Sequence, residues 1–333
     1  MKRWMLLWFI LLAAVIPAGC ENEDRNGKES GGQKFQQLPA AEDLIGTLNL
    51  KDRTVSFMNG EGSNLGKWKL SRPYTGGWIM PNGDTLVLYG PQLKTADIFS
   101  LGKGELVQSL HTGQGVANGR WDSRTGTYIF ANKKQGKIQF FQKDGTREES
   151  MEFGPYPLHM EIVGRRMYVS DYKDATVDMI DLDSRETVRS IPVHRDAAGL
   201  LIDEERNEIW TGGHGEADKA RETAAVYSLK NGRLVKEVKA PLMPIAFLES
   251  GNRVFILSHG TNRLYRYDRD TEDLASLEIG ANPFALESFH GKILVAGYDS
   301  NELYFIDPDT LKLTGRAQTG EGPFIILKRE TMQ

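Results

Sequence analysis

Short runs of apolar residues, separated by polar turns, recur along most of the chain. Residues 167–172 (MYVSDY) and 176–183 (TVDMIDLD) form one pair of such runs, joined by a polar turn. Similar pairs occur at 254–259 with 263–270 and at 293–298 with 302–309. Runs of this length, rich in β-branched and aromatic residues and bounded by turn residues, predict short β-strands. The pattern therefore indicates an all-β protein built from hairpins.

These pairs belong to a repeat that extends through the chain. We mark each repeat at the position equivalent to Asp181, and successive marks are 39 to 47 residues apart. The marks fall at Met58, Ser100, Gln142, Asp181, Ser228, Asp268 and Asp307. The residue before the mark is apolar in all seven repeats. A period of about 40 to 45 residues is typical of β-propellers with four strands per blade. Seven marks predict seven blades.

A second recurring sequence motif predicts how the ring closes. It joins a Gly- or Pro-rich turn to a short apolar run, as in Gly280–Phe284 and Gly320–Phe324. The last copy has no repeat after it, and the first repeat, at residues 44–58, has no copy before it. The strand at 324–327 should therefore complete the sheet begun at 44–59, which removes the free edge of the ring. We expect an all-β, seven-bladed β-propeller of four-stranded blades over residues 39–333, its first blade closed by the C-terminal strand.

The repeats also resemble a known family. Residues 167–187 (MYVSDYKDATVDMIDLDSRET) and 293–324 (ILVAGYDSNELYFIDPDTLKLTGRAQTGEGPF) look like YVTN-repeat, YncE-like β-propellers. The resemblance covers roughly residues 44–327. It implies an extracytoplasmic or surface protein, in a family of which many members have no assigned chemistry. Lactonase-type propellers share this fold, so the fold alone does not decide the function.

The first twenty residues have the features of an export signal. Lys2 and Arg3 precede an unbroken apolar run at 4–16, which is too short to span a membrane. Residues 17–20 (PAGC) resemble the lipobox of bacterial lipoproteins, with Pro17 where that family usually has Leu. The resemblance implies that residues 1–19 are a signal peptide and that Cys20 carries diacylglycerol and an N-acyl chain such as palmitate. An ordinary signal peptide with a stray cysteine is the alternative.

The polar, Gly-rich stretch that follows predicts a tether. Residues 20–38 contain one aromatic residue and cannot bury enough apolar surface to fold alone. Two acyl chains are sufficient for stable membrane anchoring. We therefore expect a lipoprotein of the cell envelope, anchored to the cell membrane on its extracytoplasmic side.

Composition excludes several function classes. The 333 residues include 41 Lys and Arg against 45 Asp and Glu, for a net charge of −4, which argues against broad nucleic-acid binding. A single Cys excludes an internal disulfide framework and Cys-cluster metal sites. No nucleophile elbow, Walker loop, dinucleotide motif or haem-attachment motif is present. We expect no cofactor and a monomeric chain.

Propeller geometry gathers candidate binding residues on one face. The connections between blades and the middle hairpin turns share that face, and loops on a rigid scaffold commonly carry binding residues. The candidates there are Asp171, Tyr172, His194, His214, His259, Tyr298 and Asp299. His159, on an inner strand, is a further candidate because its counterparts in other repeats are small residues such as Gly199.

The candidate residues leave the chemistry open. Imidazoles from adjacent loops could bind zinc or copper, or one could act as a general base. However, no His-x-His or His-x-x-x-His spacing occurs, so we assign neither a metal site nor catalytic residues. Glu161 and Glu287, near the ends of inner strands, would be metal ligands only in a lactonase-like enzyme.

Two functions are favoured over a third, an electron-transfer or dehydrogenase propeller, for which no cofactor ligands stand out. The first is a non-catalytic binding or scaffold module that holds an unknown protein or cell-envelope ligand on its loop face. The alternative is a metal-assisted, lactonase-like hydrolase or lyase at the channel mouth near His159, His214 and His259.

Overall fold

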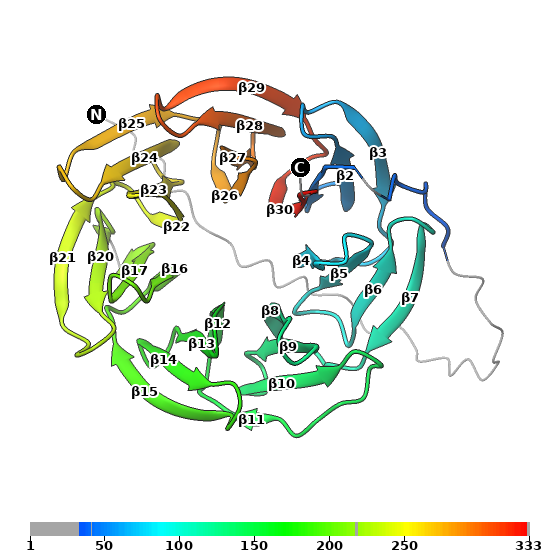
Figure 1. Cartoon of the computed structure of the whole chain (residues 1–333), viewed down its shortest axis with the longest axis horizontal. Coiled ribbons are helices and arrows are strands. Elements are labelled where there is room, and N and C mark those ends of the chain that lie inside the picture. Colours follow the sequence, from blue (N-terminus) through cyan, green and yellow to red (C-terminus); the bar gives the residue numbers. More distant parts are fainter. Residues whose placement is uncertain (1–32, 41, 217–218, 332–333) are drawn as a thin grey trace, which may run out of the picture. The chain divides into compact units, whose positions relative to one another are not determined.

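The computed structural model describes residues 33–40, 42–216 and 219–331. These residues form seven four-stranded antiparallel sheets arranged as blades around a ring (Figure 1). The expected signal peptide, Cys20 and most of the expected tether lie outside the described residues. Among the described residues, no helix has the length and apolar character needed to cross a membrane.

Each blade runs from an inner to an outer strand. Blade A comprises β30 (Pro323–Arg329), β1 (Leu44–Asn49), β2 (Thr54–Met58) and β3 (Asn64–Lys69). Blade B comprises β4 (Gly76–Ile79), β5 (Thr85–Tyr89), β6 (Ala96–Ser100) and β7 (Glu105–Leu110). Blade C comprises β8 (Val116–Asp122), β9 (Thr127–Asn132), β10 (Lys137–Gln142) and the short β11 (Met151–Glu152). Blade D comprises β12 (Pro157–Val163), β13 (Arg166–Asp171), β14 (Thr176–Asp181) and β15 (Glu186–Pro192).

The remaining three blades follow the same order. Blade E comprises β16 (Ala197–Asp203), β17 (Glu208–Gly213), β20 (Thr223–Ser228) and β21 (Leu234–Lys239). Blade F comprises β22 (Pro244–Ser250), β23 (Arg253–Ser258), β24 (Arg263–Asp268) and β25 (Leu274–Glu278). Blade G comprises β26 (Pro283–Phe289), β27 (Lys292–Gly297), β28 (Glu302–Asp307) and β29 (Lys312–Gln318). All seven sequence marks are the last residues of third strands, so the predicted repeat is confirmed.

Closure by the C-terminal strand is also confirmed. β30 pairs antiparallel with β1, from Leu44 opposite Arg329 to Asn49 opposite Pro323. The side chain of Arg329 is largely buried and donates to the backbone oxygens of Glu42, at 2.7 Å, and Gly83, at 2.9 Å. The last strand of the chain therefore completes the first blade.

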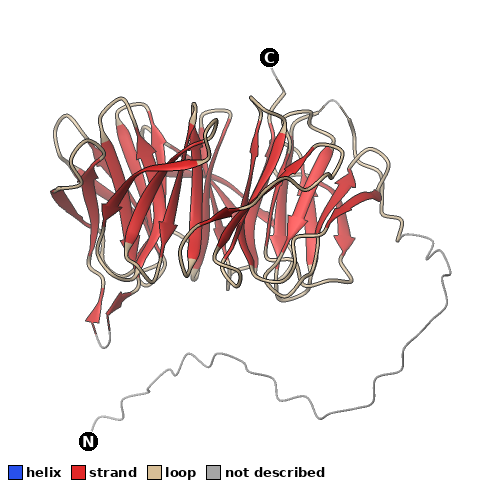
Figure 2. Cartoon of the chain, turned by 90° about the horizontal axis from the view of Figure 1, so that it is seen from below, coloured by secondary structure: helices blue, strands red, loops and turns tan. Residues whose placement is uncertain are grey.

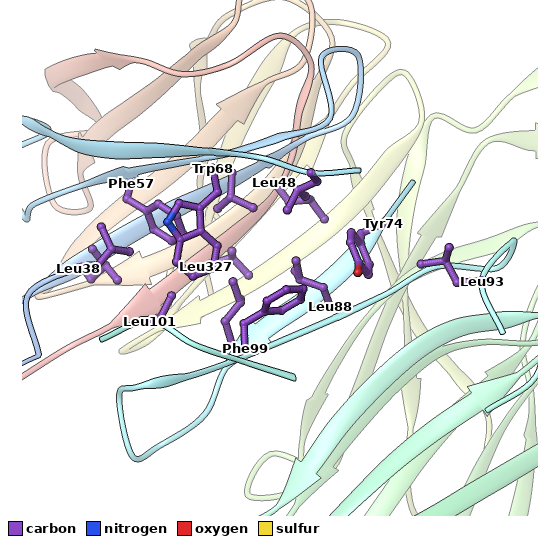
Figure 3. Close-up of a cluster of buried hydrophobic side chains, with 14 residues drawn as sticks. Leu38, Leu48, Phe57, Trp68, Tyr74, Leu88, Leu93, Phe99, Leu101 and Leu327 are labelled. Carbon is purple, nitrogen blue, oxygen red and sulfur yellow. The ribbon is translucent and has the colours of Figure 1, made fainter. Parts of the chain in front are cut away.

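Hydrophobic clusters between the blades hold the ring together. Each of the seven junctions contains one, because strands in the middle of a blade bury side chains on both faces. The cluster between blades A and B includes Trp68, Phe99 and Leu327 (Figure 3). The inner strands also contact their neighbours in sequence around the ring.

Residues 33–40 form a strap against blades A and B. Phe35 donates its backbone N–H to Gly104 O at 2.7 Å, and Leu38 donates to Leu101 O at 3.0 Å. Gly104 has a φ of 64°, and a Cβ there would lie 2.3 Å from the Phe35 oxygen, so only glycine fits. The compact unit begins at Gln33 rather than at the expected residue 39.

Candidate functional site

The loop face is the side of the ring that carries the connections between blades and the turns between second and third strands. It is the lower side in Figure 2, where the hairpin of β18 (Gly215–Glu216) and β19 (Lys219–Ala220) projects from it. This hairpin accounts for the one long repeat spacing.

Aromatic and imidazole rings from blades E, F, G and A gather at the inner part of this face. His214 and His259 have ring centroids 5.4 Å apart, and His259 lies 5.0 Å from Phe284. Phe284 in turn lies 5.2 Å from Phe324 and 5.6 Å from Tyr298. We call these five residues the axial cluster. Three of them, His214, His259 and Tyr298, were candidates from the sequence.

The two phenylalanines were missed as candidates, although the sequence carries a signal for them. Phe284 and Phe324 each follow a proline at the second position of an inner strand. The equivalent positions in blades D and F hold Leu158 and Ile245. An apolar residue at this position, directly after the Gly/Pro turn, faces the axis of the ring. The recurring sequence motif could therefore have identified both phenylalanines.

A chain of hydrogen bonds holds His259 in place. Asn282 donates from Nδ2 to Asp299 Oδ2 at 3.1 Å, and its Oδ1 lies 2.8 Å from His259 Nδ1. Lys51 forms an ion pair with Asp299 at 2.7 Å and lies 4.5 Å from the centroid of the Tyr298 ring. The Lys51 hydrogen bond keeps the pKa of Asp299 below its usual value. The structure therefore brings three sequence candidates, His259, Tyr298 and Asp299, into one connected group.

His159 lies on β12 of blade D and contacts β16 of blade E. Its Nε2 accepts the backbone N–H of Gly199 at 3.2 Å, so its neutral form carries the proton on Nδ1. Burial, Arg120 and His214 together lower the pKa of His159 to about 4. Burial and the neighbouring His259 also lower the pKa of His214. Both imidazoles are therefore neutral at pH 7.

His194 has a different environment. Its Nε2 lies 2.9 Å from Gly212 O and its Nδ1 lies 3.2 Å from the Tyr227 hydroxyl. With Nε2 donating and Nδ1 accepting, both ring nitrogens are satisfied within the fold. Burial lowers its pKa. This geometry assigns His194 a structural role.

Asp171 and Tyr172 lie on blade D. Asp171 is buried, and its oxygens accept backbone N–H groups from Tyr156, Lys173 and Asp174, each at 2.9 Å. It therefore shapes a turn. Tyr172 is 39% exposed and its ring centroid lies 5.8 Å from that of Tyr156. This tyrosine pair is a second aromatic surface of the loop face.

Charged side chains of the inner strands are paired with one another. Arg120 donates to Glu161 at 2.6 Å, and Lys328 donates to Glu287 at 2.9 Å. Both glutamates are therefore engaged with cations, which makes them poor metal ligands. In the described part of the chain, no three His, Cys, Asp or Glu residues gather in a way that could hold a metal ion.

Comparison with known proteins identifies the architecture. No protein-family model matches the chain, and no curated protein matches it. A functionally unknown protein from Desulfotomaculum acetoxidans is 13% identical, with a TM-score of 0.69 over 88% of this chain and 100% of that one. Apo AztD from Citrobacter koseri is 10% identical, with a TM-score of 0.60 over 87% and 98%.

A further similar structure is the dihydro-heme d1 dehydrogenase NirN in complex with DHE. It is 14% identical, with a TM-score of 0.63 over 88% of this chain and 76% of that one. The chain has a β-propeller fold. At these identities the similarity extends to the fold alone.

Proposed function

We propose that this propeller is a binding module of the cell envelope, which holds a protein or cell-envelope ligand on its loop face. The observation that carries the proposal is the axial cluster, where five rings from four blades meet on the face that carries the loops. Aromatic rings supply large contact areas at low entropic cost. The ligand should therefore present an apolar or aromatic group to this surface.

Site-specific photocrosslinking in intact cells tests the proposal. A photoreactive residue at Tyr298 should form a defined adduct, and Phe284→Ala with Phe324→Ala should abolish it. The matched control is a photoreactive residue at Leu313 on the outer strand β29, which is 39% exposed. The absence of an adduct at 298, or the same adduct at 313, would contradict a loop-face site.

The proposal includes a lipid anchor at Cys20 on the extracytoplasmic side of the cell membrane, and membership of the YVTN-repeat, YncE-like propellers. The lipobox-like residues 17–20 and the repeat segments support it. Cys20→Ala should release the chain from the membrane fraction, and the mature wild-type chain should have the mass of a triacylated N-terminal cysteine. An unmodified Cys20 would exclude the anchor.

The second candidate is a metal-assisted, lactonase-like hydrolase or lyase. One observation favours it: the neutral His159 and His214 and the adjacent His259 lie at the same inner part of the loop face. Hydrolysis of a panel of lactones and esters, measured with and without chelator, tests it. Turnover that chelation and His259→Ala leave unchanged would exclude this candidate.

A further inference from the structure

His259 carries a buried nitrogen that the fold leaves without a partner. The residue is 9% exposed, and its Nε2 has no hydrogen-bond partner among the described residues. Because Asn282 donates from its Nδ2 to Asp299, its Oδ1 faces His259 and must accept from Nδ1. Neutral His259 therefore has a lone pair on Nε2. A buried acceptor without a donor destabilises a fold and calls for an explanation.

The adjacent ring is a second imidazole, which is also a metal-binding group. The His214 ring lies 5.4 Å from that of His259 and is inclined by 83° to it. Two imidazoles that share a metal ion, with metal–nitrogen distances of about 2.0–2.1 Å, have centroids about 5 to 6 Å apart.

We propose that His214 and His259 form a two-imidazole site for a transition-metal ion of the Zn²⁺ or Cu²⁺ type. Imidazole suits these ions, and the hydrogen bond from His259 Nδ1 to Asn282 is the outer-shell contact that orients a histidine ligand. Asn282 is thus a positioning residue. With two protein ligands the metal keeps open positions, which water or the bound ligand fills. The inference rests on the proposed role of the axial cluster and specifies the chemistry there.

Calorimetric titration of the full-length chain with Zn²⁺ or Cu²⁺ alone, without a histidine tag, tests the site. We expect one ion per chain, and at least tenfold weaker binding in His214→Ala and in His259→Ala. The matched controls are His111→Ala, an exposed histidine of the same face, and His194→Ala, whose nitrogens are both satisfied. Both should bind as tightly as wild type.

Asn282 variants separate positioning from general damage to the fold. The exchange of Asn282→Asp combined with Asp299→Asn keeps an acceptor oxygen for His259 Nδ1 and a donor–acceptor pair between positions 282 and 299, and should retain affinity. Asn282→Leu removes the acceptor and should lose about 10- to 100-fold. Thermal unfolding would verify that each variant is folded. No binding of either ion up to millimolar concentration, or binding that survives both His214→Ala and His259→Ala, would overturn the site. Crosslinking at Tyr298 in the same variants reports ligand binding independently, so a failed metal site and a failed loop-face site give different results.

Discussion

Arg269 illustrates how much a single buried charge contributes to this fold. Its side chain is 5% exposed and joins blade F to blade E through Asp203, at 2.9 Å, and Glu208, at 3.3 Å. Replacing it by Met leaves the buried Asp203 carboxylate without this partner, which should cost about 3 kcal/mol of unfolding free energy. The exposed Arg316, 3.9 Å from Glu302, is the control and should cost less than about 1 kcal/mol on conversion to Met. Urea unfolding of both variants measures the difference; equal losses would contradict the assignment.

His159 should make the protein sensitive to acid. Its folded pKa of about 4 lies below the ordinary value of 6.5, because burial and Arg120 oppose its charge. The unfolded chain therefore binds the proton first, and the stability contribution is complete above about pH 6.5 and declines as the pH falls toward 4.

His159→Asn should flatten that decline, since blade C holds Asn118 at the equivalent position. Urea midpoints at pH 7 and pH 5 measure it, with the exposed His111→Asn as the control. A slope unchanged in His159→Asn would show that other groups cause the acid sensitivity.

At the residue scale the sequence predicts positions better than contacts. It placed His214, His259, Tyr298 and Asp299 on one face, because strand alternation fixes which loops lie together. It did not predict Asn282 as the partner of His259, since an asparagine in a turn usually caps the turn itself. Nor did it predict the ion pairs of Arg269, whose acidic partners on blade E are distant in sequence. These contacts depend on side-chain conformations, which have no periodicity.

At the scale of elements, the strap should stabilise the junction of blades A and B. Phe35 stacks on Trp68 with centroids 4.6 Å apart and meets Phe99 edge-on at 6.0 Å. Phe35→Ala should lower the unfolding free energy by about 1 to 3 kcal/mol. Gln33→Ala, which removes one exposed hydrogen bond to Lys69, should have a much smaller effect. Thermal denaturation compares them, and equal melting temperatures for wild type and Phe35→Ala would show that the strap contributes nothing.

The strap and the strands differ in how well the sequence predicts them. The strands were predictable because each blade repeats the same apolar positions, and seven copies average out local exceptions. The strap occurs once, in a stretch whose polar composition predicted a tether. Its two apolar anchors, Phe35 and Leu38, are too few to form a pattern, although both find partners in the blades.

At the scale of the whole molecule, stability should depend on closure of the ring. Deleting residues 323–333 removes β30 and exposes the edge of β1 together with one side of the clusters at both junctions of blade A. We expect this chain to lose cooperative unfolding and to aggregate, because an unpaired apolar edge recruits other strands. Removing only residues 332–333 is the control. Light scattering and circular dichroism distinguish the outcomes, and a monomeric, cooperatively unfolding deletion variant would contradict the expectation.

The same closure imposes an order of events on biosynthesis. Strands β1 to β3 are synthesised first, yet their inner partner β30 follows only after residues 70–322. At about 5–20 residues per second, blade A waits on the order of 10 to 50 s with an open edge. During that interval a premature partner, such as a second nascent chain, could occupy the place of β30. Blade A, the first blade to be started, is therefore the last to be completed.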